Sequence, residues 1–93
     1  MSSERRSKMR IFLDMLNSIA KKGGQAKPTH IMYGSNLSHD RLKSYLEFLL
    51  EKGFIEEILE DERMLYKITE RGKKFMQEFE KIEEFSNAFG IDI

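Results

Sequence analysis

The sequence contains no cysteine and no tryptophan, and it has a single proline among its 93 residues. Without cysteine there is no disulfide, no thiol nucleophile and no thiolate metal site. Long apolar runs are also lacking: residues 1–10 are charged, and Asp14 and Asn17 interrupt the apolar segment that follows. A secretion signal or a membrane-spanning helix of about 20 residues is therefore not expected. We expect one cytoplasmic domain without membrane contact.

Patterns typical of enzymes and of metal sites are missing as well. His30 and His39 have no carboxylate at metal-ligand spacing. Gly72 and Lys73 lack the preceding glycine of a phosphate-binding loop. The acidic segment 56–62 lacks the glycine and alternating ligands of a calcium loop. We expect neither enzymatic activity, nor a metal, nor a cofactor.

Charge is balanced overall but divided along the chain. Residues 1–46 carry nine Lys/Arg and three Asp/Glu, a balance of +6, whereas residues 47–93 carry seven and thirteen, a balance of −6. This polarity suits a protein with one face on a polyanion, such as nucleic acid. The alternative is that surface charges segregate by chance.

Residues 28–53 carry the pattern of a helix-turn-helix. A short apolar-polar piece ends near Gly34, a polar turn follows, and Ser38 is a good N-cap for a longer helix. Leu37 is the expected plug between the two helices. The longer helix has an apolar stripe, and its polar side is left open. The stripe consists of Leu42, Tyr45, Leu46, Leu49 and Leu50. The alternative is an ordinary helical hairpin with a solvated face.

The flanking segments complete a predicted winged helix. Helices are expected at about 7–22, 30–34 and 38–52, with Gly23 and Gly24 ending the first and a very short strand at Thr29 and His30. A β-hairpin is expected at about 54–68, with an acidic tip of open turn type. In this hairpin Ile55 and Leu59 would share one face. The second strand would place Met64, Tyr66 and Ile68 on one face.

A last helix is expected within residues 69–93, and this segment is the predicted dimer interface. Thr69 caps it, and Gly72 in its first turn would let a neighbouring element approach closely. The apolar edge of this helix is longer than a domain of residues 1–68 can cover, so a monomer would expose its distal side chains, from Phe79 onward, and a symmetric homodimer is the simplest closure. The alternative is a helix folded back over its own core. The predicted interface comprises Phe75, Phe79, Ile82, Phe85 and Phe89.

The predicted fold class is mainly α with a small β-hairpin (α+β): a winged helix-turn-helix with an added C-terminal helix. The segments IMYGSNLS at 31–38 and Y-x-I-T-x-x-G-K-x-F at 66–75 resemble the small archaeal winged-helix proteins related to the ten-kilodalton "10a" chromatin proteins. The resemblance covers residues 8–82. It implies a nucleoid-associated protein that binds duplex DNA as a homodimer, joined by C-terminal helices in an antiparallel coiled coil. The final helix is shorter here than in that family, and the wing is acidic.

The predicted function is a homodimeric transcriptional regulator that reads the major groove with the helix beginning at Ser38. A sequence-tolerant architectural protein of the nucleoid and a winged-helix module for protein contacts are the alternatives. Residues expected to reach the groove are Ser38, His39, Lys43 and Ser44. Candidate phosphate contacts are Lys21, Lys22, Lys27, His30 and Arg41, together with Arg63 on the wing.

Overall fold

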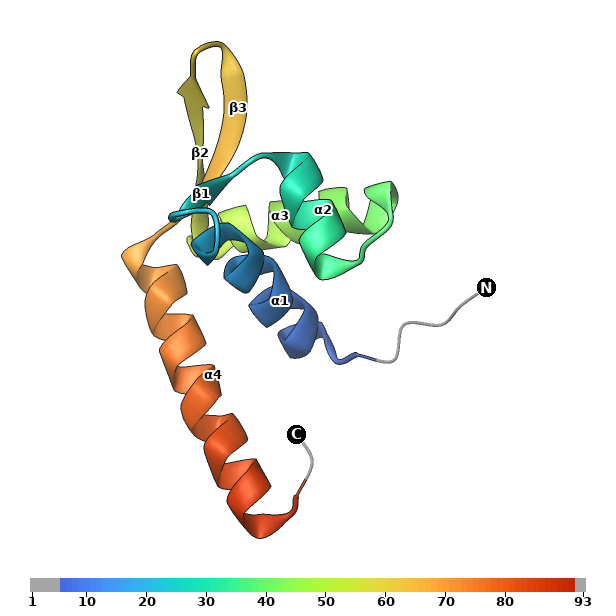
Figure 1. The fold of residues 1–93 in the computed structure, drawn as a ribbon, viewed down its shortest axis with the longest axis vertical. Helices are drawn as coiled ribbons and strands as arrows, with labels where there is room; N and C mark the ends of the chain where they lie inside the picture. Colours follow the sequence, from blue (N-terminus) through green and yellow to red (C-terminus); the bar gives the residue numbers. More distant parts are fainter. Residues whose placement is uncertain (1–5, 92–93) are drawn as a thin grey trace.

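Four helices and a three-stranded antiparallel sheet follow one another along residues 6–91, the part of the chain that the computed structural model describes (Figure 1). They form a winged helix-turn-helix with an added C-terminal helix, which is the fold class predicted from the sequence. The elements are α1 (Lys8–Ala20), β1 (Gln25–Ala26), α2 (Pro28–Ser35), α3 (His39–Glu51), β2 (Ile55–Glu60), β3 (Arg63–Ile68) and α4 (Glu70–Phe89).

The apolar core lies between α1, α2, α3 and the base of the sheet. α1 and α3 each turn one apolar stripe inward, because their large side chains recur every three or four residues. Ser7 and Ser38 begin these helices as N-caps, each hydroxyl accepting a hydrogen bond from the amide three residues later. Gly23 and Gly24, both with positive φ, follow the end of α1. The main core residues are Ile11, Phe12, Met15, Leu16, Ile19, Ile31, Leu42, Leu46, Leu49 and Ile55.

Small residues let α1 and α2 pack closely. A Cβ atom added at Gly34 would lie 2.4 Å from Ser18 Oγ, so this contact requires glycine. The two neighbouring hydroxyls are satisfied within their own helices: Ser18 Oγ donates to Asp14 O at 2.9 Å, and Ser35 Oγ donates to Ile31 O at 2.6 Å. Ser35 can therefore be buried without an unpaired hydroxyl.

The short strand lies earlier in the chain than predicted. Thr29 and His30 belong to α2, because Pro28 occupies the first helical position, where its missing N–H has no helical partner to lose. Lys27 before it is extended, as expected for a residue preceding proline. The strand is instead β1, which pairs with β3 through Gln25 opposite Lys67 and Ala26 opposite Tyr66.

The wing is the hairpin of β2 and β3, and it rises away from the helices (Figure 1). The sheet order is β1-β3-β2, and the hairpin register runs from Ile55 opposite Ile68 to Glu60 opposite Arg63. Asp61 and Glu62 form its two-residue turn with φ values of 52° and 63°. Two positive φ values are those of a type I′ turn, which matches the twist of the strands.

Burial along the wing departs from the predicted alternation. Ile55 and Ile68 are buried at the base, but Leu59 is 72% exposed and Met64 opposite it is also exposed. Leu65 is buried although it belongs to the other face of its strand. β3 contacts α1, α2 and β1, so burial on the wing depends on which positions these elements cover as well as on strand face.

α4 begins against the base of the wing. Thr69 is its N-cap and accepts a hydrogen bond from Gly72 N at 3.0 Å. A Cβ atom at Gly72 would lie 2.3 Å from Phe54 O, which confirms that this glycine permits a close approach. One turn later, the rings of Phe75 and Phe54 stack with centroids 4.9 Å apart. Gly90, in the left-handed conformation, ends the helix.

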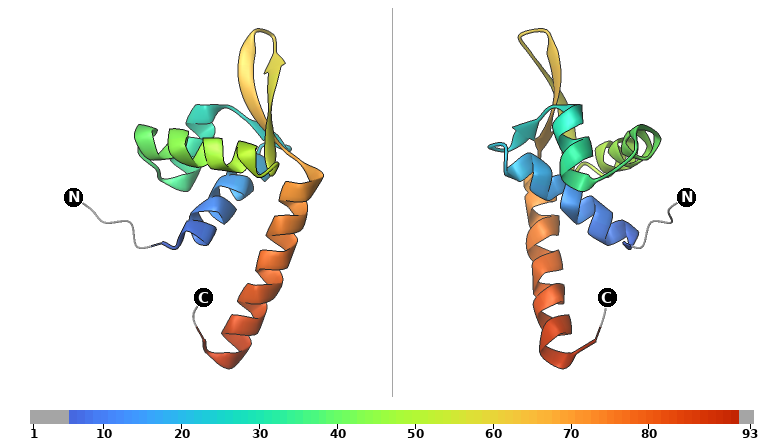
Figure 2. Two further views of the ribbon diagram at one scale, coloured as in Figure 1. Left: turned by 180° about the vertical axis from the view of Figure 1, so that it is seen from behind. Right: turned by 45° about the vertical axis from the view of Figure 1, so that its right-hand side comes forward.

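The middle of α4 packs on α1, which corrects one prediction. Phe79 was expected to be exposed in a monomer, yet it is only 3% exposed within this chain. The guanidinium carbon of Arg10 lies 5.3 Å from the Phe79 ring centroid, and Arg10 also forms an ion pair with Glu83. Beyond this contact α4 continues away from the helical core (Figure 2).

Candidate nucleic-acid interface

The turn between α2 and α3 has the geometry of a helix-turn-helix. α2 ends at Ser35, and the following C-cap residue, Asn36, has a φ of 56° and a ψ of 52°, in the left-handed region that asparagine tolerates. Leu37 follows and is buried as the predicted plug between the helices. Its amide donates to Met32 O at 3.1 Å, closing the last turn of α2. Ser38 then caps α3, so the direction of α3 is fixed at its first residue.

α3 has a buried leucine stripe and an open outer face. In the view from behind, α3 lies in front of the other helices, with the wing rising beside its C-terminal end (Figure 2). His39, Lys43 and Ser44 are exposed near its N-terminal end. The next two turns expose Glu47 and Glu51. The Lys and Arg residues of α3 therefore lie in its first half, whereas two of its three carboxylates lie in its second half.

Carboxylates also lie on the centre of that outer face. Asp40, Ser44, Glu47 and Glu51 are spaced i, i+4, i+7 and i+11, so they form one stripe. Asp40 in the first turn favours the helix dipole. A polyanion would meet repulsion along most of this stripe. The surface that suits a phosphate backbone is limited to the start of α3.

The other predicted phosphate contacts fall in three places. Lys27 and His30 are at the start of α2, and Arg41 is in the first turn of α3. Lys21 and Lys22 lie in the turn after α1. This turn is bonded to the base of the wing, because Ile68 N donates a hydrogen bond to Gly24 O at 3.0 Å. That turn lies at the root of α4, on the other side of the helical core from the α2–α3 turn (Figure 1). The structure therefore does not bring all the predicted cations together.

A groove separates the turn after α1 from α4. Its volume is about 420 Å³, and Gly23, Gly24, Met76 and Gln77 are among its lining residues. Lys73 and Glu80 lie at its rim from α4. Lys21 and Lys22 thus belong to the neighbourhood of this groove rather than to that of α3.

The wing is acidic on both strands. Glu56, Glu57 and Glu60 come from β2, and Asp61 and Glu62 form the tip. Arg63 begins β3 directly after the tip. Burial, followed by the negative charge of Glu57 and a hydrogen bond to it, raises the pKa of Tyr66 above its usual value of 10.0. An acidic hairpin is poorly suited to lie along phosphates.

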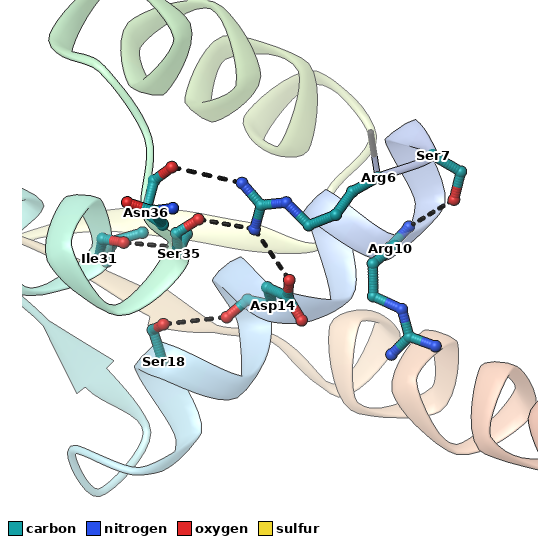
Figure 3. A network of polar contacts seen from close by, with 8 residues as sticks. All are labelled: Arg6, Ser7, Arg10, Asp14, Ser18, Ile31, Ser35 and Asn36. Atoms are coloured by element: carbon teal, nitrogen blue, oxygen red, sulfur yellow. Dashed lines mark hydrogen bonds and ion pairs between the residues drawn. The ribbon is translucent and has the colours of Figure 1, made fainter. Parts of the chain in front are cut away.

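A residue with no predicted role, Arg6, contacts the α2–α3 turn. Arg6 precedes α1, and its Nη1 donates to Asp14 Oδ2 at 2.9 Å and to Ser35 O at 2.7 Å (Figure 3). Its Nη2 donates to Asn36 O at 3.3 Å. An arginine before a helix gives no sequence signal for such a role, because the acceptors lie 29 and 30 residues away.

The distal part of α4 leaves an apolar face uncovered. Phe85 is 63% exposed and Phe89 66% exposed, and their rings lie 4.8 Å apart between centroids. Ile82 is exposed one turn before them. We call Ile82, Phe85 and Phe89 the distal α4 face. Of the five predicted interface residues, Phe75 and Phe79 pack within the chain, and these three form the distal α4 face.

Two other kinds of site find no support in residues 6–91. Within them, no three His, Asp or Glu side chains come together as a group that could hold a metal ion. No helix among the same residues is long and apolar enough to cross a membrane.

Comparison with known proteins agrees with this geometry. A family model described as winged helix-turn-helix matches residues 5–87. The chain belongs to the winged helix-turn-helix family. An uncharacterized protein of the archaeon Methanocaldococcus jannaschii is 33% identical to this winged-helix protein over 84 residues, which is 90% of this chain and 80% of the relative.

Two solved structures share the fold. Sso10a-2, a DNA-binding protein from Sulfolobus solfataricus, matches with a TM-score of 0.78 and 25% identity, covering 90% of this chain and 85% of that one. F93 from STIV, a winged-helix DNA-binding protein, matches with a TM-score of 0.71, covering 86% and 92%. At 12% identity the second likeness concerns the fold alone. The resemblance to small archaeal winged-helix proteins that the sequence indicated is confirmed.

Proposed function

We propose that this winged-helix protein binds duplex DNA as a homodimer and regulates transcription. The observation that carries the proposal is the start of α3, where a capped helix end exposes His39, Lys43 and Ser44 beside the α2–α3 turn. In a helix-turn-helix, the N-terminal residues of the second helix reach the base edges. The DNA-binding description of Sso10a-2, which shares the fold at 25% identity, supports the same function.

The charges on α3 favour one way of entering the groove. The N-terminal half can approach the bases, with Lys43 placed to reach guanine acceptors and Ser44 to donate to a base edge or phosphate. The C-terminal half carries Glu47 and Glu51 and must stay clear of the phosphates. α3 therefore enters at a tilt, with its first turn deepest.

Phosphate contacts come from both sides of that first turn. Ser38 presents its hydroxyl at the cap, and Arg41 lies on the flank of α3. Lys27 and His30, at the start of α2, extend the positive surface. Lys21, Lys22 and Arg63 lie farther away, so in this proposal they contact DNA only where the duplex bends toward the root of α4 or the wing.

The second copy joins through the distal α4 face. Ile82, Phe85 and Phe89 are spaced i, i+3 and i+7, so they face one direction and would pack against the same face of a partner helix. An isologous contact of this kind places two copies of α3 about a two-fold axis. A dimer reads two half-sites and gains affinity and specificity that one helix with two Lys/Arg side chains lacks.

The wing favours a second candidate function, contact with another protein. Leu59 and Met64 pair directly across the hairpin and are both exposed, with Glu60 and Asp61 beside them. An acidic hairpin with an apolar pair suits a basic protein surface better than it suits DNA. In this second function the exposed side chains at the start of α3 have no binding role.

The deciding experiment measures binding to a fluorescent duplex by anisotropy at low and moderate salt. The wild type is expected to bind, and Lys43→Glu to weaken binding at least tenfold. Lys74→Glu is the matched control, since it makes the same charge change on exposed α4. Equal affinity of Lys43→Glu and the control removes the assignment of α3 to the groove. No binding by the wild type at low salt favours protein contact instead.

A competition experiment with random duplex DNA then tests whether the protein is a sequence-specific regulator. A regulator prefers a pseudo-palindromic site selected from a random pool, whereas a sequence-tolerant architectural protein is displaced equally by all sequences. Solution mass with and without the duplex reports the stoichiometry. A homodimer gives two chains per selected site.

A further inference from the structure

Arg6 lies outside every helix and yet contacts the segment that sets the direction of α3. Its guanidinium joins α1, through Asp14, to the last two residues before the plug Leu37, namely Ser35 and Asn36 (Figure 3). Asp14 lies in the middle of α1, so the contact links Arg6 and α1 to the α2–α3 turn.

The acceptors at the end of α2 need such a donor. The final carbonyls of a helix have no partner inside it. In α2, the amides of Asn36 and Leu37 satisfy Tyr33 O and Met32 O. Arg6 donates to two further carbonyls at this end, Ser35 O and Asn36 O, and places a positive charge at the negative end of the helix dipole.

Asp14 orients the guanidinium of Arg6. A guanidinium presents donors in a fixed planar fork, so a carboxylate on one side fixes where the other donors point. Nη1 lies between Asp14 Oδ2 and Ser35 O, at 2.9 Å and 2.7 Å. Arg6 and Asp14 are both about three-quarters buried, with side-chain exposures of 23% and 29%. The pair is thus partly shielded from salt.

We propose that Arg6 is a positioning residue for DNA recognition: held by Asp14, it fixes the left-handed turn at Asn36 and thereby the angle of α3. This inference rests on the proposed function and goes beyond it, since Arg6 acts through the turn and not by touching DNA. The Asn36 turn is the natural hinge, because a non-glycine residue in the left-handed region is stabilised there mainly by its surroundings.

The direction in which one substitution changes DNA affinity distinguishes a positioning role from a purely electrostatic effect. Asp14→Asn removes a negative charge, so electrostatics alone would strengthen DNA binding. If Asp14 orients Arg6, the same change weakens binding. We expect a loss of about fivefold for Asp14→Asn and about tenfold for Arg6→Gln, which corresponds to the contribution of a charged hydrogen bond. Asp40→Asn is the matched control on exposed α3, and it should bind more tightly.

Salt dependence distinguishes positioning from a direct phosphate contact. Loss of one phosphate contact lowers the slope of log K against log salt by about 0.9. Arg6→Gln is expected to lower affinity with an unchanged slope, and Arg6→Lys to recover part of the affinity. Lys8→Gln, an exposed charge at the start of α1, serves as the control for lost charge near Arg6.

A measurement without DNA tests the role of Arg6 in the turn independently of DNA binding. Amide hydrogen exchange at Asn36 and Leu37 is expected to become at least fivefold faster in Arg6→Gln and in Asp14→Asn, but not in Lys8→Gln. The double variant should exchange no faster than the faster single variant, because both remove one contact. Unchanged exchange at these amides, or tighter DNA binding by Asp14→Asn, would overturn the positioning role. If the wild type binds no duplex, the exchange result still decides whether Arg6 fixes the turn.

Discussion

Arg10 and Phe79 join the start of α1 to the middle of α4, with the guanidinium carbon 5.3 Å from the ring centroid. Arg10 also pairs with Glu83, one turn further along α4. A cation over an aromatic face and an ion pair on the same guanidinium hold the helix at one angle to the core. The proximal part of α4, up to this contact, packs against the fold. The distal part beyond it carries the exposed side chains of Ile82, Phe85 and Phe89.

Truncating the proximal part should destabilise the monomeric fold. Phe79→Ala removes a buried ring between α1 and α4, and the free energy of unfolding should fall by about 3 kcal/mol. The measurement is urea unfolding followed by circular dichroism at several protein concentrations. The loss is expected at every concentration, because the ring packs within its own chain. A loss that appears only at high concentration would instead assign Phe79 to a subunit interface.

Substitution on the distal α4 face should change the association of two chains and leave the stability of the single chain almost unchanged. Phe85→Ser changes an exposed side chain, so the unfolding free energy at low concentration should change by less than about 0.5 kcal/mol. The solution mass should shift from two chains to one, as measured by light scattering across a dilution series. Glu84→Ser, the exposed neighbour, is the control and should leave the mass unchanged. A wild-type mass of one chain at high concentration contradicts the proposed dimer.

Sequence periodicity predicted the helices and the hairpin because each has a local cause. Ser38 and Thr69 are caps in the structure as in the prediction, and Gly23 and Gly24 follow the end of α1 as expected. β1 was misplaced because two residues that pair with a distant strand leave no periodic signal. The burial of Phe79 depends on the angle between two helices, which no local pattern encodes.

Gly72 is required by the close approach of α4 to the base of the wing. In Gly72→Ala the new methyl group would lie 2.3 Å from Phe54 O and 2.9 Å from Ile68 Cγ1. Backbone cannot yield as a flexible side chain can, so the free energy of unfolding should fall by about 2 kcal/mol or more, despite the better helix propensity of alanine. Thermal unfolding checks this. Lys73→Ala, exposed in the same turn, should change stability by less than about 0.5 kcal/mol.

The wing turn carries strain that can be removed. Asp61 and Glu62 both adopt positive φ in the type I′ turn, a conformation that Asn-Gly occupies more easily. The double variant Asp61→Asn with Glu62→Gly should raise the free energy of unfolding by about 1 kcal/mol and the melting temperature by about 4–8 °C. The control Asp61→Ala with Glu62→Ala removes the same two charges without relieving the backbone. An equal gain in the control would assign the effect to charge rather than to φ.

The candidate site was only partly predictable for a physical reason. The exposed side of α3 follows from the leucine stripe, so Ser38, His39, Lys43 and Ser44 could be placed outside from periodicity alone. Which distant cations share that surface depends on the path of the chain between elements. Lys21 and Lys22 are close in sequence to α2, but the turn that carries them is tied to the base of the wing through Gly24 and Ile68. The role of Arg6 likewise depends on a contact across 29 residues.

Tyr66 should make the folded state sensitive to alkaline pH. Burial, the charge of Glu57 and the hydrogen bond to it raise the pKa of this phenol above 10.0, so the folded protein holds the proton more tightly than the unfolded chain does. The resulting stability is fully present below the unfolded pKa and is lost as the pH rises through the folded pKa.

The variant Tyr66→Phe cannot ionise, so its free energy of unfolding should fall less than that of the wild type between about pH 9 and about pH 11.5. All other side chains are the same in both proteins, so the comparison isolates the effect of Tyr66. Glu57→Gln tests the cause: it removes the charge but leaves the burial, so the alkaline loss should lie between those of the wild type and Tyr66→Phe. The measurement is urea unfolding at each pH. Parallel pH profiles for the wild type and Tyr66→Phe would show that the phenol is not held in its protonated form by the fold.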